Sequence, residues 1–141
     1  MAKDSGRTVG KRTAPQIGHM MDDGTVYVGV SPSTKKAMFT TSRDAPRLRN
    51  FEEAQAYRRD RNKRKAHGHD DWRLATPGEL AVLFNRSERI GRFKISSEHP
   101  DNLYWSSKQD GYGSAVVRNF SNGREENRLK DYRASLRLVC G

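Results

Sequence analysis

Two helix starts with strong capping signals stand between two groups of short strand-like runs, and this order constrains the fold more than any other feature. At the clearer start, Thr76 can cap the helix, Pro77 suits its first position, and Glu79 can reach back to the capping residue. Asn50 and Glu53 repeat the capping pattern one helix earlier. Since strands precede and follow the two helices, the sequence predicts an α+β fold.

Turn residues separate the runs that we expect to be strands. In the first half, Asp22-Asp23-Gly24 lies between residues 17–21 and 25–30 in the pattern of a hairpin, and a further strand is expected at 37–41. In the second half, strands are expected at 103–106, 115–120 and 135–140, with turns at Asp110-Gly111 and Asn122-Gly123. Each half therefore contributes a small β-meander.

The first helix, which starts near Phe51, has an apolar stripe for two turns only. After Tyr57 every face is charged, and Gly68 offers a stop. The second helix carries three residues that we expect to point inward: Leu80, Leu83 and Phe84.

A small core must hold this chain together, because only 33% of its 141 residues are hydrophobic. We interpret Trp72 and Trp105 as core anchors rather than as platforms that stack on sugar rings. The length suits one domain, so we expect a single domain at residues 15–141. Residues 1–14 have almost nothing to bury and are expected to form a flexible basic arm.

The sequence shows no signal peptide and no run of roughly 20 apolar residues that could span a membrane. Cys140 is the only cysteine, so no intramolecular disulfide can form. We therefore expect a cytoplasmic or virion-associated protein.

Positive charge is concentrated in the first half of the chain. Of the formal net charge of +10, residues 1–65 carry +8, with fifteen Lys and Arg against seven Asp and Glu. The excess is concentrated in the arm and in a candidate polyanion-binding set at the end of the first helix: Arg58, Arg59, Arg61, Lys63, Arg64 and Lys65. Such a run is either a solvated face or a site for phosphates or sulfates, which the forked guanidinium of arginine suits.

A dense group of metal-capable side chains precedes the Trp72 strand. His67 and His69 have a spacing that places two imidazoles on one side of an extended segment, with Asp70 and Asp71 beside them. A transition-metal site would need a third ligand from elsewhere in the chain. We interpret the group as a polar turn and assign no metal.

Four segments in a fixed order resemble the Legionella collagen-like C-terminal domain family. They are HDDWRLATPGEL at residues 69–80, YWSS at 104–107, residues 116–123, and LRLV at 136–139. The resemblance covers roughly residues 17–141. It implies a C-type-lectin-like fold, related also to formylglycine-generating enzymes, with two helices beside a twisted, loop-rich antiparallel sheet.

The resemblance also implies that late loops, residues 109–112 and 119–130, present the ligand-binding side chains. The candidates are Asp110, Tyr112, Asn119, Asn122, Arg124, Arg128 and Lys130. C-type lectins bind calcium in such loops, and oxygen ligands are available here. However, the lectin tripeptides EPN and WND are missing, and the interleaved cations oppose a dication, so no cofactor is assigned.

No catalytic signature stands out. A single cysteine cannot supply the copper-binding cysteine pair of formylglycine-generating enzymes, and no G-x-S-x-G, P-loop or H-E-x-x-H motif occurs. We expect Cys140 to be a small buried hydrophobe and the protein not to be an enzyme.

Three functions remain open. The leading one is a lectin-like binding module that recognises an anionic polysaccharide or a surface protein, as the name-giving adhesin of the family is associated with sulfated polysaccharides. The second is a structural or assembly protein of a phage particle, attached by its basic arm to an acidic partner or nucleic acid. The third is a nucleic-acid binder that does not read base sequence, and no nucleic-acid-binding motif in the sequence supports it.

Overall fold

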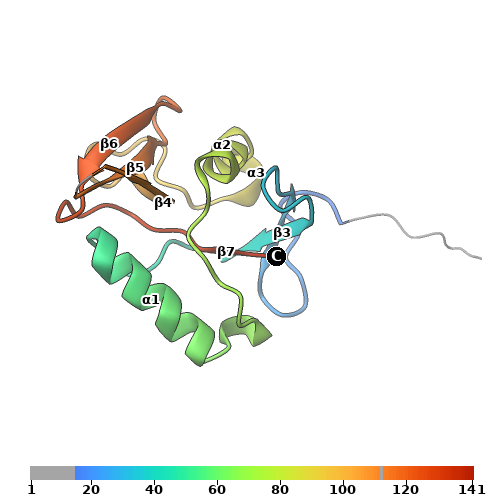
Figure 1. Ribbon diagram of the computed structural model, residues 1–141. Helices are drawn as coiled ribbons and strands as arrows, with labels where there is room; N and C mark the ends of the chain where they lie inside the picture. Colours follow the sequence, from blue (N-terminus) through green and yellow to red (C-terminus); the bar gives the residue numbers. More distant parts are fainter. Residues whose placement is uncertain (1–14, 112) are drawn as a thin grey trace, which may run out of the picture.

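The computed structural model describes residues 15–111 and 113–141, so the predicted arm at 1–14 and the predicted ligand residue Tyr112 lie outside the described residues. The fold is α+β, as predicted, with two antiparallel three-stranded sheets and few helices (Figure 1). In chain order the elements are β2 (Val26–Val30), β3 (Ala37–Thr40), α1 (Phe51–Lys63), the 3-10 turn η1 (Ala66–Gly68), α2 (Pro77–Asn85), α3 (Ser87–Ile90), β4 (Leu103–Asp110), β5 (Ser114–Asn119), β6 (Glu125–Leu129) and β7 (Val139–Cys140).

The last segment of the chain joins the two sheets. One sheet has the order β2-β3-β7 and the other the order β4-β5-β6. On its way to β7, the segment makes a parallel bridge from Ser135 to Tyr104 of β4 and an antiparallel bridge from Val139 to Arg73. Figure 1 shows this red segment crossing from the side of β4–β6 to β3. Residues near the C-terminus are therefore central to the fold.

Both tryptophans lie in the core, as predicted. Trp72 and Trp105 are 1% and 0% exposed. The indole N–H of Trp72 donates to the carbonyl oxygen of Ala66 at 2.9 Å, and the indole N–H of Trp105 donates to the carbonyl oxygen of Arg49 at 2.7 Å. Neither ring is available to stack on a sugar.

Local capping signals correctly predict where the helices begin. Asn50 caps α1 and Thr76 caps α2, each in a reciprocal capping box with the glutamate three residues later. The end of α1 was predicted too late, at Gly68. The helix ends at Lys63, because Lys65 adopts a left-handed conformation with φ of 50° and starts the separate turn η1.

Four predictions about strands need correction. Residues 125–129, predicted as part of a loop, form the edge strand β6, whose alternating exposure and polar composition hid it. β4 extends four residues beyond the predicted end, to Asp110. In the predicted strand 135–140, only β7 is a regular strand. In the predicted strand 17–21, only the isolated bridge between Met20 and Val26 forms, although the chain turns at residues 22–24 as predicted.

None of the described helices is both long enough and apolar enough to cross a membrane.

Candidate functional site

The predicted late-loop ligand residues do not form one site. At one end of the β5–β6 hairpin, Asp110 accepts a hydrogen bond from Asn127 at 2.5 Å, and Lys130 donates one to Gln109 at 2.5 Å. At the other end, Asn119 donates to Glu126 at 3.1 Å. Asp110 pairs with Ser114 at the start of β5 and Asn119 ends that strand, so five steps of about 3.3 Å place the backbones of Asp110 and Asn119 roughly 16 Å apart.

The polar groups at these two ends largely satisfy one another. Asn122 accepts a bond from the backbone N–H of Arg124, and Arg128 is paired with Glu126 at 2.6 Å. Burial raises the pKa of Glu126, but the bonds from Asn119 and Arg128 outweigh it and hold the pKa below its ordinary value. Across the described residues, the late carboxylates do not gather into a group of three that could hold calcium.

The predicted polyanion set is spread around α1 rather than along one face. At 3.6 residues per turn, Arg59 and Arg61 lie on roughly opposite sides of the helix. Asp60 binds Arg61 at 2.6 Å and Arg64 at 2.9 Å, and these bonds hold its pKa below the ordinary value. The rest of the set comprises Arg58, whose Nε donates to Gln55, and the exposed Lys63 and Lys65.

A second arginine-rich segment, which the sequence reasoning missed, faces the same helix. Residues 41–49 pass beside α1 and contain Arg43, Arg47 and Arg49, three arginines within seven residues. That local density was the available signal. Together, residues 41–65 carry nine Lys and Arg and four Asp and Glu. The basic surface is thus built from two segments.

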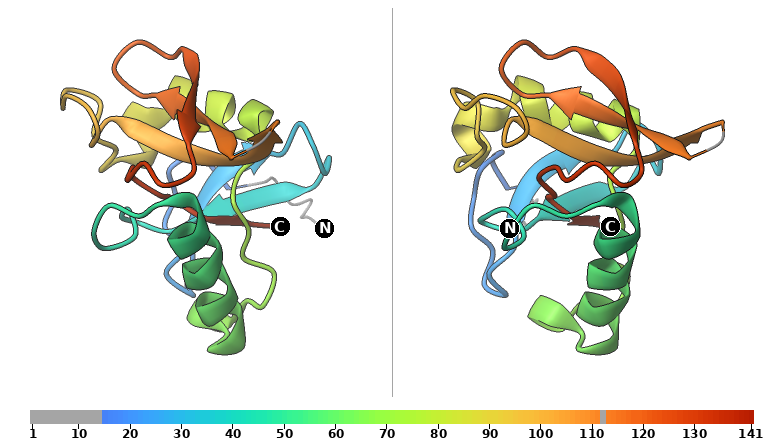
Figure 2. Two further views of the ribbon diagram at one scale, coloured as in Figure 1. Left: turned by 60° about the vertical axis from the view of Figure 1, so that its left-hand side comes forward. Right: turned by 90° about the vertical axis from the view of Figure 1, so that its left-hand side faces the viewer.

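A pocket of about 270 Å³ lies between this segment and α1. Its rim includes Arg43, Arg61 and His67, and its only acidic residue is Asp44. The remaining lining residues are Thr41, Ser42, Ala45, Pro46, Tyr57, Ala66, Trp72 and Leu138. We refer to it as the α1 pocket. Figure 2 shows the C-terminal half of α1 projecting away from β6, so this pocket is remote from the late loops.

Arg61 holds a distinctive place in the α1 pocket. Its guanidinium lies over the Tyr57 ring, 5.1 Å from the centroid, and Arg49 lies over the same ring at 4.2 Å. Burial and the charge of Arg47 lower the pKa of Arg49 from its ordinary value. The Nε of Arg61 is buried and has no hydrogen-bond partner among the described residues. A buried guanidinium N–H without an acceptor favours a bound anion or water.

Asp44 does not cancel the positive charge of the pocket, because both of its oxygens are occupied. Oδ1 accepts from the Nε of Arg137 at 2.9 Å, and Oδ2 accepts from the Tyr104 hydroxyl at 2.6 Å. Arg137 is fully buried and also donates to the carbonyls of Thr41 and Arg92, at 3.0 and 2.9 Å. Arg137 thus neutralises the Asp44 carboxylate from the protein interior, and Arg43 and Arg61 remain to act on a ligand.

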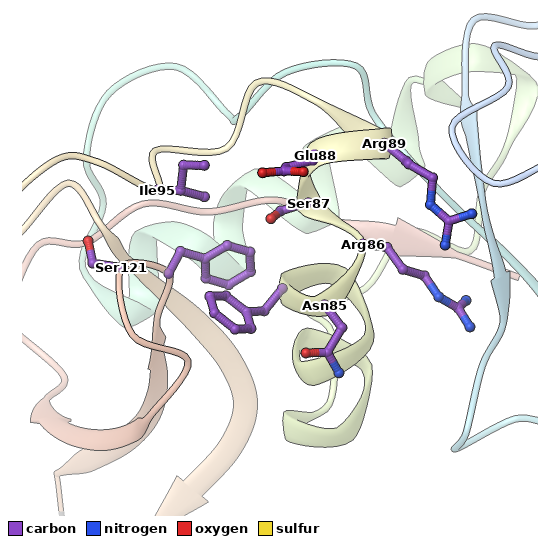
Figure 3. A pocket seen from close by; sticks show the side chains of 9 residues that line it. Asn85, Arg86, Ser87, Glu88, Arg89, Ile95 and Ser121 are labelled. Carbon is purple, nitrogen blue, oxygen red and sulfur yellow. The ribbon is translucent and has the colours of Figure 1, made fainter.

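A larger hollow of about 440 Å³ next to α3 is less suited to an anion. Figure 3 shows the side chains of Arg86 and Arg89 pointing away from Ile95 and Ser121, which lie on its other side. Arg86 donates to the carbonyl of Val28 at 2.7 Å. This guanidinium therefore ties α2 to β2 rather than facing the hollow.

The two histidines predicted to share a turn do not converge on one ligand position. His67 Nδ1 lies 2.9 Å from the carbonyl oxygen of Asp23, and His69 Nε2 lies 2.7 Å from the Asp23 carboxylate. Asp70 is exposed. His69 instead gathers with Asp71 and Cys140.

Comparison with known protein families matches residues 21–140 to the Lcl C-terminal domain. Comparison with curated proteins finds no match.

Proposed function

The chain belongs to the Lcl C-terminal domain family, and we propose that it binds a sulfated or otherwise anionic polysaccharide without catalysing a reaction. The family suggests a binding or adhesion-related module. The proposed contact surface is the α1 pocket and the basic residues around it, in place of the late loops. We also propose that its α+β fold is a variant of the C-type-lectin-like one.

The charge distribution supports this location. Residues 41–65 carry a net charge of +5, out of +7 for the described residues. Three of the four acids in this segment are already engaged: Asp44 with Arg137, Glu53 with Arg133 and the backbone N–H of Asn50, and Asp60 with Arg61 and Arg64. Several cations keep no hydrogen-bonded acid in the described part of the chain: Arg43, Arg47, Arg59, Lys63 and Lys65. Such a surface attracts polyanions.

The buried, unpaired Nε of Arg61 is the observation that carries the proposal. A sulfate or carboxylate group entering the α1 pocket would supply the missing acceptor, with Arg43 and His67 on the rim. Arg118 also has a buried Nε without a partner, but it lines neither the α1 pocket nor the hollow next to α3. The pocket volume of about 270 Å³ is below that of typical small-molecule sites, which suits one charged group of a longer chain.

The aromatic residues favour a polysaccharide over a single-stranded nucleic acid. Proteins that bind single strands without reading sequence stack bases on exposed aromatic rings. Here both tryptophans are buried, and the ring of Tyr57 is covered by Arg49 and Arg61. The described surface therefore offers charge and hydrogen-bond donors but no stacking platform beside them.

The test compares binding of a sulfated polysaccharide and of duplex DNA, each at low and near-physiological salt. The double variant Arg43→Ala/Arg61→Ala should lower affinity for the polysaccharide at least tenfold. The control Arg89→Ala/Arg124→Ala removes two exposed arginines elsewhere and should change it less than about threefold.

If the two double variants lose affinity for the polysaccharide equally, the proposed location is wrong. Because the control removes Arg124, this result would favour the late loops as the contact surface. If DNA and polysaccharide bind alike and both dissociate at physiological salt, the surface is a nonspecific electrostatic one. In that case the proposal fails, and attachment to an acidic partner within a phage particle becomes the better account.

A further inference from the structure

Three metal-capable side chains from distant parts of the chain meet beside η1. His69 and Asp71 follow the turn, and Cys140 reaches them from β7. Their ligand atoms all lie within 4.8 Å of one another. Cys140 is buried, His69 is half-buried and Asp71 is exposed, so the group has an apolar floor and a mouth open to solvent.

A second carboxylate, that of Asp23, borders the group. Asp23, in the turn before β2, places its Oδ2 atom 2.7 Å from His69 Nε2. Its other oxygen, Oδ1, is held by the backbone N–H and the hydroxyl of Thr25, at 2.9 and 2.7 Å. Similarly, the Oδ2 atom of Asp71 accepts a bond from the backbone N–H of Gly141 at 3.0 Å, which fixes that side chain and leaves Oδ1. Both carboxylates are thus oriented by bonds from outside the group.

We propose that His69, Asp71 and Cys140 form a binding site for a divalent transition metal of the zinc type, with Asp23 orienting the His69 ring. Thiolate, imidazole and carboxylate are the ligands that zinc takes in proteins. Ligand atoms on a tetrahedral zinc ion lie about 3.3–3.5 Å apart. A separation within 4.8 Å can therefore close onto an ion through small side-chain rotations.

Two carboxylates beside Cys140 supply negative charge for a cation, whereas burial opposes a free thiolate. Burial, followed by the charges of Asp71 and Asp23, raises the pKa of Cys140 to about 12. Without metal the side chain is a neutral thiol, which is a poor nucleophile. On binding, the thiol proton leaves to solvent as the sulfur–metal bond forms. Nearby Arg73 does not compete for the carboxylates of the group, because it binds Glu79 in a bidentate pair.

An ion at this position would join three segments that are far apart in the sequence. The residues after η1 and β7 would supply the ligands, and the turn at residues 22–24 would be held to them through the contact between Asp23 and His69. Because the unfolded chain does not hold these segments together, binding favours the folded state and raises the melting temperature.

The test uses tag-free protein, treated with chelator and titrated with Co²⁺ as a spectroscopic probe and with Zn²⁺ in competition against a chromophoric chelator. Wild-type protein should bind one ion per chain and show a thiolate-to-cobalt charge-transfer band. Cys140→Ser should abolish the band. Asp71→Asn should weaken binding at least tenfold and remove most of the rise in melting temperature. Asp70→Asn, a change at the adjacent exposed carboxylate, is the matched control and should leave affinity within about twofold.

Binding without a thiolate band in the wild-type protein would overturn the proposal, since ions would then sit on other surface histidines. Equal effects of Asp70→Asn and Asp71→Asn would overturn it as well. If Cys140→Ser fails to fold, as judged by near-ultraviolet circular dichroism, the comparison between the two aspartate variants decides the matter.

Discussion

Asp44 and Arg137 form a buried ion pair beneath the α1 pocket, with 2.9 Å between Oδ1 and Nε. Arg137 is 0% exposed, and its guanidinium also lies over the Phe93 ring at 3.9 Å from the centroid. Burial lowers the pKa of Arg137 from its ordinary value, and Asp44 opposes that shift. The pair therefore anchors both the floor of the pocket and the segment that joins the two sheets.

Replacing Asp44 by Ala should destabilise the protein by about 3–5 kcal/mol, because the buried guanidinium of Arg137 loses its counter-ion. Urea unfolding followed by far-ultraviolet circular dichroism measures the change. Asp131→Ala, at an exposed position, should change the free energy of unfolding by less than about 0.5 kcal/mol. A loss below about 1 kcal/mol for Asp44→Ala would mean that the pair is not structural.

Glu79 should make stability depend on pH in the acid range. Burial raises its pKa, but bonds from Arg73, Ser31 and the Thr76 backbone outweigh this and place the pKa below the ordinary 4.5. A carboxyl with a lowered folded-state pKa stabilises above its unfolded pKa and loses that contribution as pH falls through the folded value. The contribution of Glu79 to the free energy of unfolding should therefore be complete above about pH 5 and decline below about pH 4.

Glu79→Gln tests this assignment in urea titrations at a series of pH values from 3 to 7. The variant should be less stable at pH 7 by about 2–3 kcal/mol, because charged hydrogen bonds are lost. The gap to the wild-type protein should narrow on acidification. Glu88→Gln, an exposed change in α3, should run parallel to wild type. A constant gap across the series would show that Glu79 does not titrate as stated.

How much of this could be predicted from the sequence depends on the distance between interacting residues. Capping boxes join residues three positions apart, so Asn50 and Thr76 could be identified as helix caps. The α1 pocket rests on Asp44 and Arg137, which are 93 positions apart, and nothing local indicates that contact. The metal-capable group needed Cys140 beside His69 and Asp71, whereas the local sequence offered only the neighbours His67, Asp70 and Asp71.

Strand β6 shows a further limit. Glu125–Leu129 contains no β-branched or aromatic residue, and its pairing with β5 comes from the backbone rather than from apolar side chains. The predicted late loop consequently includes a strand, and its candidate residues are separated to the two ends of a hairpin. The late-loop ligand surface inferred from loop position therefore stays a prediction, on residues that the hairpin divides between its two ends.

Gly123 should tolerate alanine poorly. Its φ is +80°, and an added Cβ would lie 2.6 Å from Phe84, whose ring packs edge-on against Phe120. We expect Gly123→Ala to cost about 2–4 kcal/mol, the sum of left-handed backbone strain and overpacking. Gly111→Ala, with φ of +63° and no atom within 4 Å, should show the backbone cost alone, about 1 kcal/mol. Thermal unfolding measures the loss of stability in each variant. Equal losses in Gly123→Ala and Gly111→Ala would show that the Phe84 side chain moves away without cost.

The proposed binding surface is tested most directly by mapping a sulfated oligosaccharide onto the protein by amide and arginine side-chain NMR at near-physiological salt. The account predicts the largest shift changes at Arg43, Tyr57 and Arg61, with the Nε–H signal of Arg61 moving as it gains an acceptor. Changes centred instead on Asn122, Arg124 and Arg128, with the α1 pocket unaffected, would contradict it.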